Sequence, residues 1–257
     1  MTAHRACAAV DSPTGENPGP HFSETPPAKL LRSIAIPGPA GRLEALLNQG
    51  AQVAKFAALV CHPHPSGGGT MHNKVVYHAM KVLNDPAWGF LWPTLRFNFR
   101  GTGLSQGSHD GLAESEDVQA AVAWLASEYQ LPIIVVGFSF GAVMALKACS
   151  NVPTGDVRAL ALLGLPTRIP NRVSSNEIQH NFLHNCTLPK LFLSGNQDQF
   201  ASPADLLEIT AAAHAPKHLE LIPGADHFFT GHIQPMQQAL RNWLSALFPQ
   251  LPTEQPQ

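Results

Sequence analysis

The sequence predicts an α/β fold in which a mostly parallel sheet is covered by helices on both faces. Short apolar runs alternate with helical segments along most of the chain, which is the pattern of β-α-β units. Several runs, such as Phe56 to Cys61, are apolar at nearly every position, as in strands buried on both faces. The length of 257 residues also suits one large α/β domain.

The elements follow from local signals taken in chain order. A Pro-Gly-Pro-Ala-Gly turn separates the first two strands, and Val118, Val122 and Leu125 recur on one face of a later helix. The final helix carries apolar residues at heptad-like spacing. Strands are predicted at 33–36, 42–47, 56–61, 92–99, 131–136, 159–163, 191–194 and 219–222, and helices at 74–84, 113–128, 142–149, 203–213 and 233–247.

One domain is expected, at 29–248, because no repeat or linker interrupts the pattern. Residues 1–28 hold five prolines and are expected to form a disordered arm, and 249–257 a flexible tail. In the sheet that this pattern predicts, ligands bind beyond the carboxyl ends of the strands. Candidate site residues are therefore sought where strands end.

Composition excludes several functional classes. Hydrophobic residues make up 44% of the chain and charged residues 13%, the net charge is -2 and no basic run exists, which argues against nucleic-acid binding. No apolar stretch approaches the roughly 18 residues that span a membrane, and no secretion signal begins the chain. Four cysteines lack C-x-x-C spacing and are read as free thiols. They are Cys7, Cys61, Cys149 and Cys186. We expect a cytoplasmic monomer or homodimer with no membrane or nucleic-acid partner.

The segment Gly137-Phe138-Ser139-Phe140-Gly141 lies between a predicted strand and a predicted helix. This is the setting of a G-x-S-x-G nucleophile elbow, in which a sharp turn exposes the serine hydroxyl at the end of a sheet. The amide of Phe140 lies at a helix N-terminus beside that hydroxyl, where it can stabilise negative charge. The pattern predicts Ser139 as a nucleophile.

A serine needs a base, and the base needs a partner that fixes its tautomer. Asp198 and His227 each follow a predicted strand, and they occur in the order Ser, Asp, His that elbow enzymes use. Alone, Asp198 could be a helix cap or turn residue and His227 a surface histidine. Asp226 adjoins the histidine and is poorly placed to orient it, and Asp205 lies inside a helix. The predicted triad is Ser139, Asp198 and His227.

The loop 61–70 follows a buried strand, where the second oxyanion donor of such a site normally lies. Pro63 and Pro65 have no N–H, so in this stretch beyond His62 the amide of His64 can donate. We predict His64 and Phe140 as the oxyanion pair.

The histidines of this region also admit a metal site, but the loop has no nearby Asp, Glu or Cys ligand at characteristic spacing. We therefore predict no metal. The histidines concerned are His62, His64, His72 and His78.

Two other positions are candidates for substrate contact. Arg100 begins a glycine-rich loop that matches neither a Walker A motif nor a dinucleotide fingerprint, so a structural pin is the preferred reading of this arginine. Phe138 adjoins the nucleophile and could shape its pocket or simply pack in the core.

Together these motifs resemble the α/β-hydrolase superfamily, and within it the small dienelactone-hydrolase-related predicted hydrolases, which are esterase-like. The resemblance covers about 32–247 and rests on H-P-H-P-S-G-G-G-T-M-H-N-K-V-V, R-F-N-F-R-G-T-G-L-S-Q-G, G-F-S-F-G and G-A-D-H-F-F. It implies an eight-stranded sheet, the same triad and no cofactor. True dienelactone hydrolases use cysteine where this chain has Ser139, so dienelactone itself is not the expected substrate.

The expected activity is hydrolysis of small- to medium-chain carboxylic esters, with a small-molecule ester as partner. The segment 166–188 is too short for a full cap domain, which favours a shallow pocket and small acyl groups. A peptidase or thioesterase could use the same triad. A catalytically silent binding protein and a metal-dependent hydrolase are the remaining alternatives.

Overall fold

The computed structural model describes residues 31–150, 155–167 and 181–249. These residues form one eight-stranded sheet in the order β1-β2-β4-β3-β5-β6-β7-β8. The pairs β1–β2 and β2–β4 are antiparallel, and all other neighbouring strands are parallel. The strands are β1 (Leu31–Gly38), β2 (Gly41–Asn48), β3 (Ala57–Cys61), β4 (Thr94–Phe97), β5 (Ile133–Phe138), β6 (Val157–Leu163), β7 (Lys190–Gly195) and β8 (Lys217–Ile222). The predicted mostly parallel sheet is confirmed.

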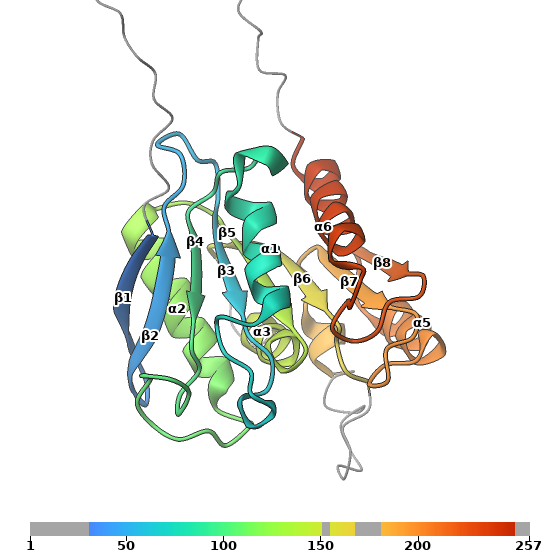
Figure 1. The fold of residues 1–257 in the computed structure, drawn as a ribbon, viewed down its shortest axis with the longest axis horizontal. Helices are drawn as coiled ribbons and strands as arrows, with labels where there is room; N and C mark the ends of the chain where they lie inside the picture. The colour runs from blue at the N-terminus through green and yellow to red at the C-terminus, as the bar shows by residue number, and fades with distance from the viewer. Residues whose placement is uncertain (1–30, 151–154, 168–180, 250–257) are drawn as a thin grey trace, which may run out of the picture.

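Helices cover both faces of this sheet. In Figure 1, α1 and α6 lie in front of it, and α2 and α3 lie behind it. The longer helices are α1 (Lys74–Asn84), α2 (Glu114–Tyr129), α3 (Phe140–Ser150), α5 (Pro203–Ala212) and α6 (Ile233–Leu247). Each face has its own apolar core, because β3 and β5 are buried at every position and supply side chains to both sides.

Local sequence explains where the best-predicted helices begin and which face they bury. The Asn73 side chain accepts a hydrogen bond from the Val75 amide and so caps α1. On α6, Met236, Leu240 and Leu244 are fully buried at helical spacing. Both helices have the predicted bounds.

The strand ends differ from the prediction where pairing, rather than apolar character, decides them. The predicted strand 92–99 is shorter in the structure, because Pro93 has no N–H to give to a ladder and Asn98 already follows the last paired residue, Phe97. The strand before the elbow ends two residues later than predicted, because Phe138 still pairs with Leu163 of β6. The helix that follows begins at Phe140, directly after Ser139.

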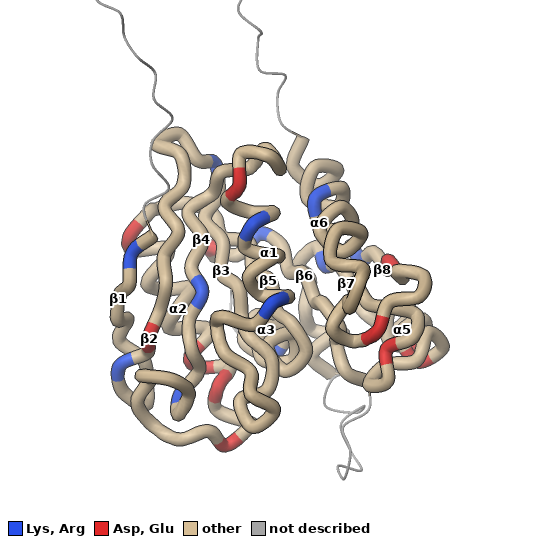
Figure 2. Tube along the Cα trace, viewed as in Figure 1, with Lys and Arg blue, Asp and Glu red and all other residues tan. Residues whose placement is uncertain are grey.

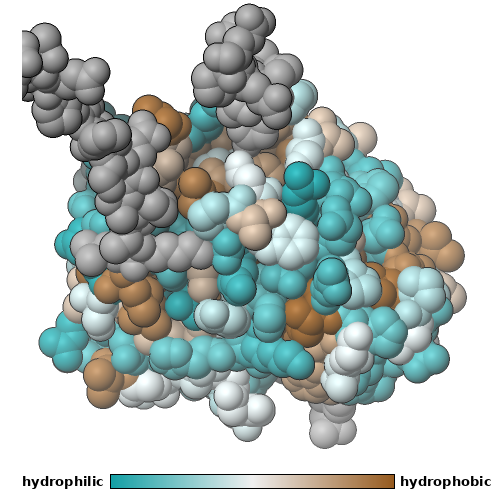
Figure 3. Space-filling view, turned by 45° about the horizontal axis from the view of Figure 1, so that its top comes forward, coloured by the Kyte–Doolittle hydropathy of each residue, from teal (hydrophilic) through white to brown (hydrophobic). Residues whose placement is uncertain are grey.

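Charged side chains are sparse on the chain, and Figure 2 shows both signs interspersed along the trace without a basic stripe. The face in Figure 3 is mainly hydrophilic, with smaller hydrophobic patches between polar residues. Within the described ranges, no helix is long and apolar enough to cross a membrane. The predicted arm at 1–28 and the tail from 250 onward lie outside the described residues.

Candidate active site

Ser139 occupies the turn between β5 and α3 in a strained backbone conformation. Its φ is 54°, in the left-handed region that residues with a Cβ seldom adopt. Hydrogen bonds hold it there: its amide donates to the Leu163 carbonyl at 2.9 Å, and its carbonyl accepts from the Ala142 amide at 2.9 Å. The turn therefore fixes Ser139 at the carboxyl end of β5, directly before α3.

The two glycines of the motif are required by close backbone contacts. A Cβ on Gly137 would lie 2.4 Å from the Gly141 carbonyl oxygen, and one on Gly141 would lie 2.5 Å from the Cys61 oxygen and 2.6 Å from the His62 oxygen. No side chain fits at either distance. The glycines let α3 begin directly against β5 and against the loop that follows β3.

The structure brings the three residues of the predicted triad together from the ends of three strands. His227 Nε2 lies 2.9 Å from Ser139 Oγ, and His227 Nδ1 lies 2.8 Å from Asp198 Oδ2. All three follow carboxyl ends of strands, namely β5, β7 and β8. His227 and Asp198 are buried, at 2% and 6% exposed, so water competes little for this pair.

Further donors fix the Asp198 carboxylate. Ser194 Oγ donates to Oδ2 at 3.0 Å, and the Phe200 amide donates to Oδ1 at 2.8 Å. An aspartate held as an acceptor in this way requires the proton of His227 to lie on Nδ1, which leaves Nε2 to accept from the serine hydroxyl. The arrangement can move a proton from Ser139 Oγ to His227 and stabilise the resulting imidazolium.

Ser194 and Phe200 are two contacts that sequence reasoning missed. Ser194 stands as a polar residue at the end of an apolar strand just before the acid, which was the available signal. Phe200 gives no signal in the sequence, because its contact is made through the backbone amide. Its ring also packs on the His227 ring, with centroids 4.6 Å apart.

The two rival acids have other partners. Asp226 Oδ1 accepts from the Phe228 and Thr230 amides at 3.1 and 2.8 Å, and hydrogen bonds from this loop backbone lower the pKa of its carboxyl group. Asp205 lies in the first turn of α5 and accepts from Thr167 Oγ1 at 3.2 Å. In the structure, the His227 ring is therefore hydrogen-bonded to Asp198 and not to Asp226 or Asp205.

His64 and Phe140, the predicted oxyanion pair, lie side by side with ring centroids 4.9 Å apart. Phe140 is the first residue of α3, so its amide has no acceptor within the helix and lies at the positive end of the helix dipole. His64 caps the 3-10 turn Pro65–Gly67, and its Nδ1 accepts from the Ser66 amide at 3.2 Å. The cap holds the loop after β3 in one conformation.

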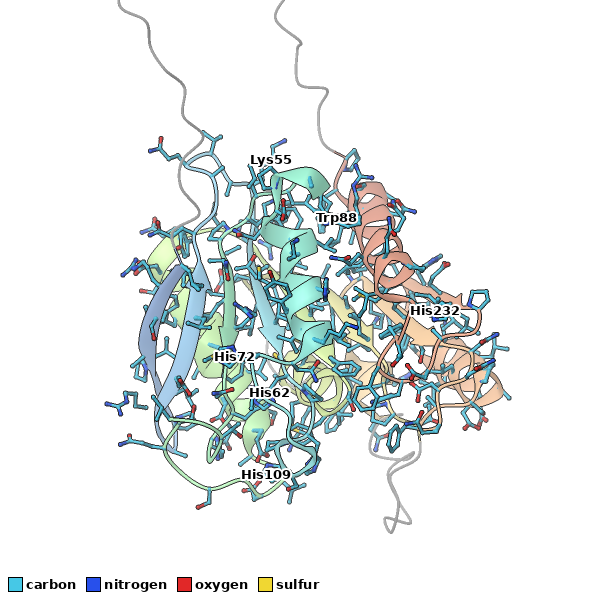
Figure 4. All side chains as sticks on the ribbon, in the orientation of Figure 1. Lys55, His62, His72, Trp88, His109 and His232 are labelled. Atoms are coloured by element: carbon cyan, nitrogen blue, oxygen red, sulfur yellow. The ribbon has the colours of Figure 1, made fainter. Side chains whose placement is uncertain are left out.

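His62 also fixes the loop that follows β3, through a hydrogen bond at each of its two ring nitrogens. Its Nδ1 donates to the Pro63 carbonyl at 2.6 Å, and its Nε2 accepts from the Phe99 amide at 3.0 Å. Complete burial lowers the pKa of His62 from 6.5 to about 4, so the ring is neutral near pH 7. Figure 4 shows His62 and His109 toward the end of the sheet to which the β3 and β4 arrows point, and His72 on the same side.

Both ring nitrogens of His62 thus have protein partners. Within 31–150, 155–167 and 181–249, no group of three or more His, Cys, Asp or Glu side chains is arranged to hold a metal ion. Cys61, Cys149 and Cys186 are buried free thiols, and burial raises the pKa of Cys61.

Arg100 and Phe138, the two candidates for substrate contact, are both turned into the protein. Arg100 is 6% exposed and binds Asp117 of α2, with Nη2 2.7 Å from Oδ1, so its position agrees with the preferred role of structural pin. Phe138 is 1% exposed, and its ring packs near the His227 ring, with the two centroids 5.2 Å apart.

Comparison with known proteins gives the same fold and family. The sequence model of a protein family described as an alpha/beta hydrolase domain matches residues 94–247. An uncharacterized protein of Rickettsia prowazekii is 32% identical over 222 residues, which are 83% of this chain and 89% of the relative.

Two solved structures are similar over most of their length. An α/β serine hydrolase without a lid from Xanthomonas campestris is 25% identical, with a TM-score of 0.72 over 86% of this chain and 97% of that one. An α/β serine hydrolase homologue from Coxiella burnetii is 30% identical, with a TM-score of 0.72 over 82% of this chain and 96% of that one. The match of the domain model to more than half of the chain shows that this protein belongs to the α/β-hydrolase family.

Proposed function

We propose that the protein is a serine carboxylesterase that cleaves small- to medium-chain esters through an acyl-enzyme. The observation that carries this proposal is the continuous hydrogen-bond chain from Ser139 Oγ through His227 to Asp198. Acyl transfer requires a serine hydroxyl that is hydrogen-bonded to an imidazole able to take its proton. Membership of a family of hydrolases supports the same reaction.

In the proposed mechanism, His227 Nε2 takes the proton of Ser139 as Oγ attacks the ester carbonyl carbon. The amides of Phe140 and His64 stabilise the oxyanion, and Asp198 stabilises the imidazolium. His227 then protonates the departing alcohol. Water, deprotonated by the same nitrogen, attacks the acyl-enzyme and releases the acid, which restores the serine hydroxyl.

The preference for small acyl groups rests on the length of the segment between β6 and β7. In this family a cap over the site would be inserted there, and the 26 residues between Leu163 and Lys190 are too few to form a cap domain. Residues 168–180 of that segment lie outside the described part of the chain. The similar hydrolase from Xanthomonas campestris is described as lacking a lid.

The nucleophile is tested by Ser139→Ala, with Ser127→Ala as the matched control. Ser127 is an exposed serine near the C-terminal end of α2. Turnover of p-nitrophenyl acetate and butyrate should fall by roughly 10³-fold or more in Ser139→Ala and stay at the parent level in the control. A fluorophosphonate probe should label the parent at Ser139. Equal activity in the two variants would remove Ser139 from the mechanism.

The same assays separate the alternatives. A panel of esters, thioesters and aminoacyl amides distinguishes an esterase from a thioesterase or peptidase, because the triad does not determine the leaving group. Full activity in excess chelator would exclude a metal-dependent hydrolase. A folded protein that neither turns over esters nor takes the probe would be a silent binding protein.

A further inference from the structure

A second histidine–carboxylate pair lies next to the proposed oxyanion hole and has no part in the mechanism above. His109 Nδ1 lies 2.5 Å from Glu114 Oε1. The side chain of Glu114 is fully buried at the first turn of α2, and that of His109 is 19% exposed. Burying a carboxylate without a partner destabilises the folded state, and His109 supplies a partner to Glu114 Oε1. The other oxygen, Oε2, has no hydrogen-bond partner among the residues that the structure describes.

Backbone contacts hold the Glu114 carboxylate in place. Its Oε1 also accepts from the Asp110 amide at 3.0 Å and from the Gly111 amide at 3.2 Å. Because a carboxylate oxygen accepts, His109 donates to it from Nδ1, and that bond sets the plane of the ring. The loop that carries it is also tight: a Cβ on Gly101, where φ is 70°, would lie 2.8 Å from the His109 amide nitrogen.

The fixed His109 ring contacts both residues whose amides are the proposed oxyanion donors. Its centroid lies 4.7 Å from that of His64 and 5.5 Å from that of Phe140, each with an edge-to-face geometry. His64 and Phe140 also pack on each other at 4.9 Å. The three rings form a closed cluster, and His109 is the member that joins the β3 loop and the start of α3 to the start of α2.

We propose that His109, anchored by Glu114, is a positioning residue that holds the His64 and Phe140 amides at the spacing the oxyanion needs. Donors placed before the reaction stabilise developing charge without reorganisation, so small displacements reduce the rate. One donor lies in the loop after β3 and the other at the start of α3, and ring packing adds to the backbone contact of Gly141 with Cys61 and His62 that joins these two segments. This inference rests on the proposed function, since it assigns a role within that oxyanion hole.

The test compares His109→Ala, which removes the ring, with His109→Phe, which keeps a flat ring but loses the bond to Glu114. In His109→Phe, Glu114 Oε1 still accepts from the Asp110 and Gly111 amides. His109→Ala should lower kcat for p-nitrophenyl butyrate about tenfold or more with KM changed less than about twofold, because only the transition state carries the oxyanion. His109→Phe should lower kcat by less than His109→Ala, because it keeps the ring contacts but loses the bond to Glu114 that sets the plane of the ring.

A trifluoromethyl ketone that forms a tetrahedral adduct with Ser139 gives a second readout. Its inhibition constant should rise by the same factor as kcat/KM falls across the variants, as for a group that stabilises the transition state. The control is His218→Ala, which removes an exposed His–Glu pair on β8, where His218 Nε2 lies 3.4 Å from Glu220 Oε2. It should leave both quantities unchanged.

Thermal unfolding of each variant separates a positioning role from loss of fold. Should His109→Ala not fold, His109→Leu, which keeps side-chain volume without a flat ring, takes its place with the same expected loss of kcat. Parent-level kcat and inhibitor affinity in a folded variant without the ring would overturn the proposal while leaving Ser139 as the nucleophile. A parent protein with no Ser139-dependent turnover would instead overturn the proposed function.

Discussion

The buried neutral His62 makes the stability of this protein depend on pH in a way that one substitution can isolate. Its pKa is about 4 in the folded protein, against 6.5 for the free side chain. Between these values the unfolded chain binds more protons than the folded one, so the free energy of unfolding falls as the pH drops through that window. The effect fades as the pH rises above 6.5, because His62 then becomes neutral in the unfolded chain as well.

The shift of the pKa sets the size of the effect. Lowering the pH from about 7 to about 5 removes about 2 kcal/mol of unfolding free energy through His62, and the full shift corresponds to about 3 kcal/mol. The comparison is His62→Gln, which does not titrate. Its side-chain oxygen can accept from the Phe99 amide in place of Nε2, but it loses the ring contact with Phe99, whose centroid is 4.7 Å away.

Urea unfolding of both proteins at the two pH values, followed by tryptophan fluorescence, measures the effect. The buried Trp92 is a reporter. At about pH 7 the variant should be less stable than the parent by about 1–3 kcal/mol, since it loses a buried hydrogen bond and ring packing. At about pH 5 this difference should shrink by about 2 kcal/mol, because only the parent protonates a buried ring when it unfolds. A difference that stays constant between the two pH values would refute the reasoning.

Two further substitutions test the acid and the arginine. Asp198→Asn should keep the fold but lower kcat for p-nitrophenyl esters by roughly 10³- to 10⁴-fold, because the amide no longer enforces the Nδ1–H tautomer of His227. A loss below tenfold would show that another acid orients His227. Arg100→Met should lower the urea-unfolding free energy by about 3–5 kcal/mol, because the fully buried side chain of Asp117 loses its cation. Unchanged stability with a large rise in KM would restore a substrate-binding role for Arg100.

The nucleophile and its setting could be predicted from the sequence because they are local. Strand, turn, serine and helix are contiguous from Ile133 to Ser150, and the two glycines needed for the close approach lie inside the same pentapeptide. The parallel arrangement likewise follows from the alternation of apolar runs and helices, which short-range physical preferences determine. The strand ends were less predictable, since pairing with a neighbouring strand decides them.

Contacts between distant parts of the chain are what the sequence left open. His227 stands 88 positions from Ser139 and 29 from Asp198, and order alone does not separate Asp198 from Asp226 or Asp205. The tertiary structure decides, because β7 and β8 are neighbours in the sheet and their loops leave the same edge. The sequence alone therefore determined the kind of fold and the serine at its turn. The sequence also favoured Asp198 as the acid, but only folding brings its carboxylate to His227 and decides which rings surround the oxyanion donors. Hydrogen bonds and ring contacts depend on positions in space that no local pattern encodes.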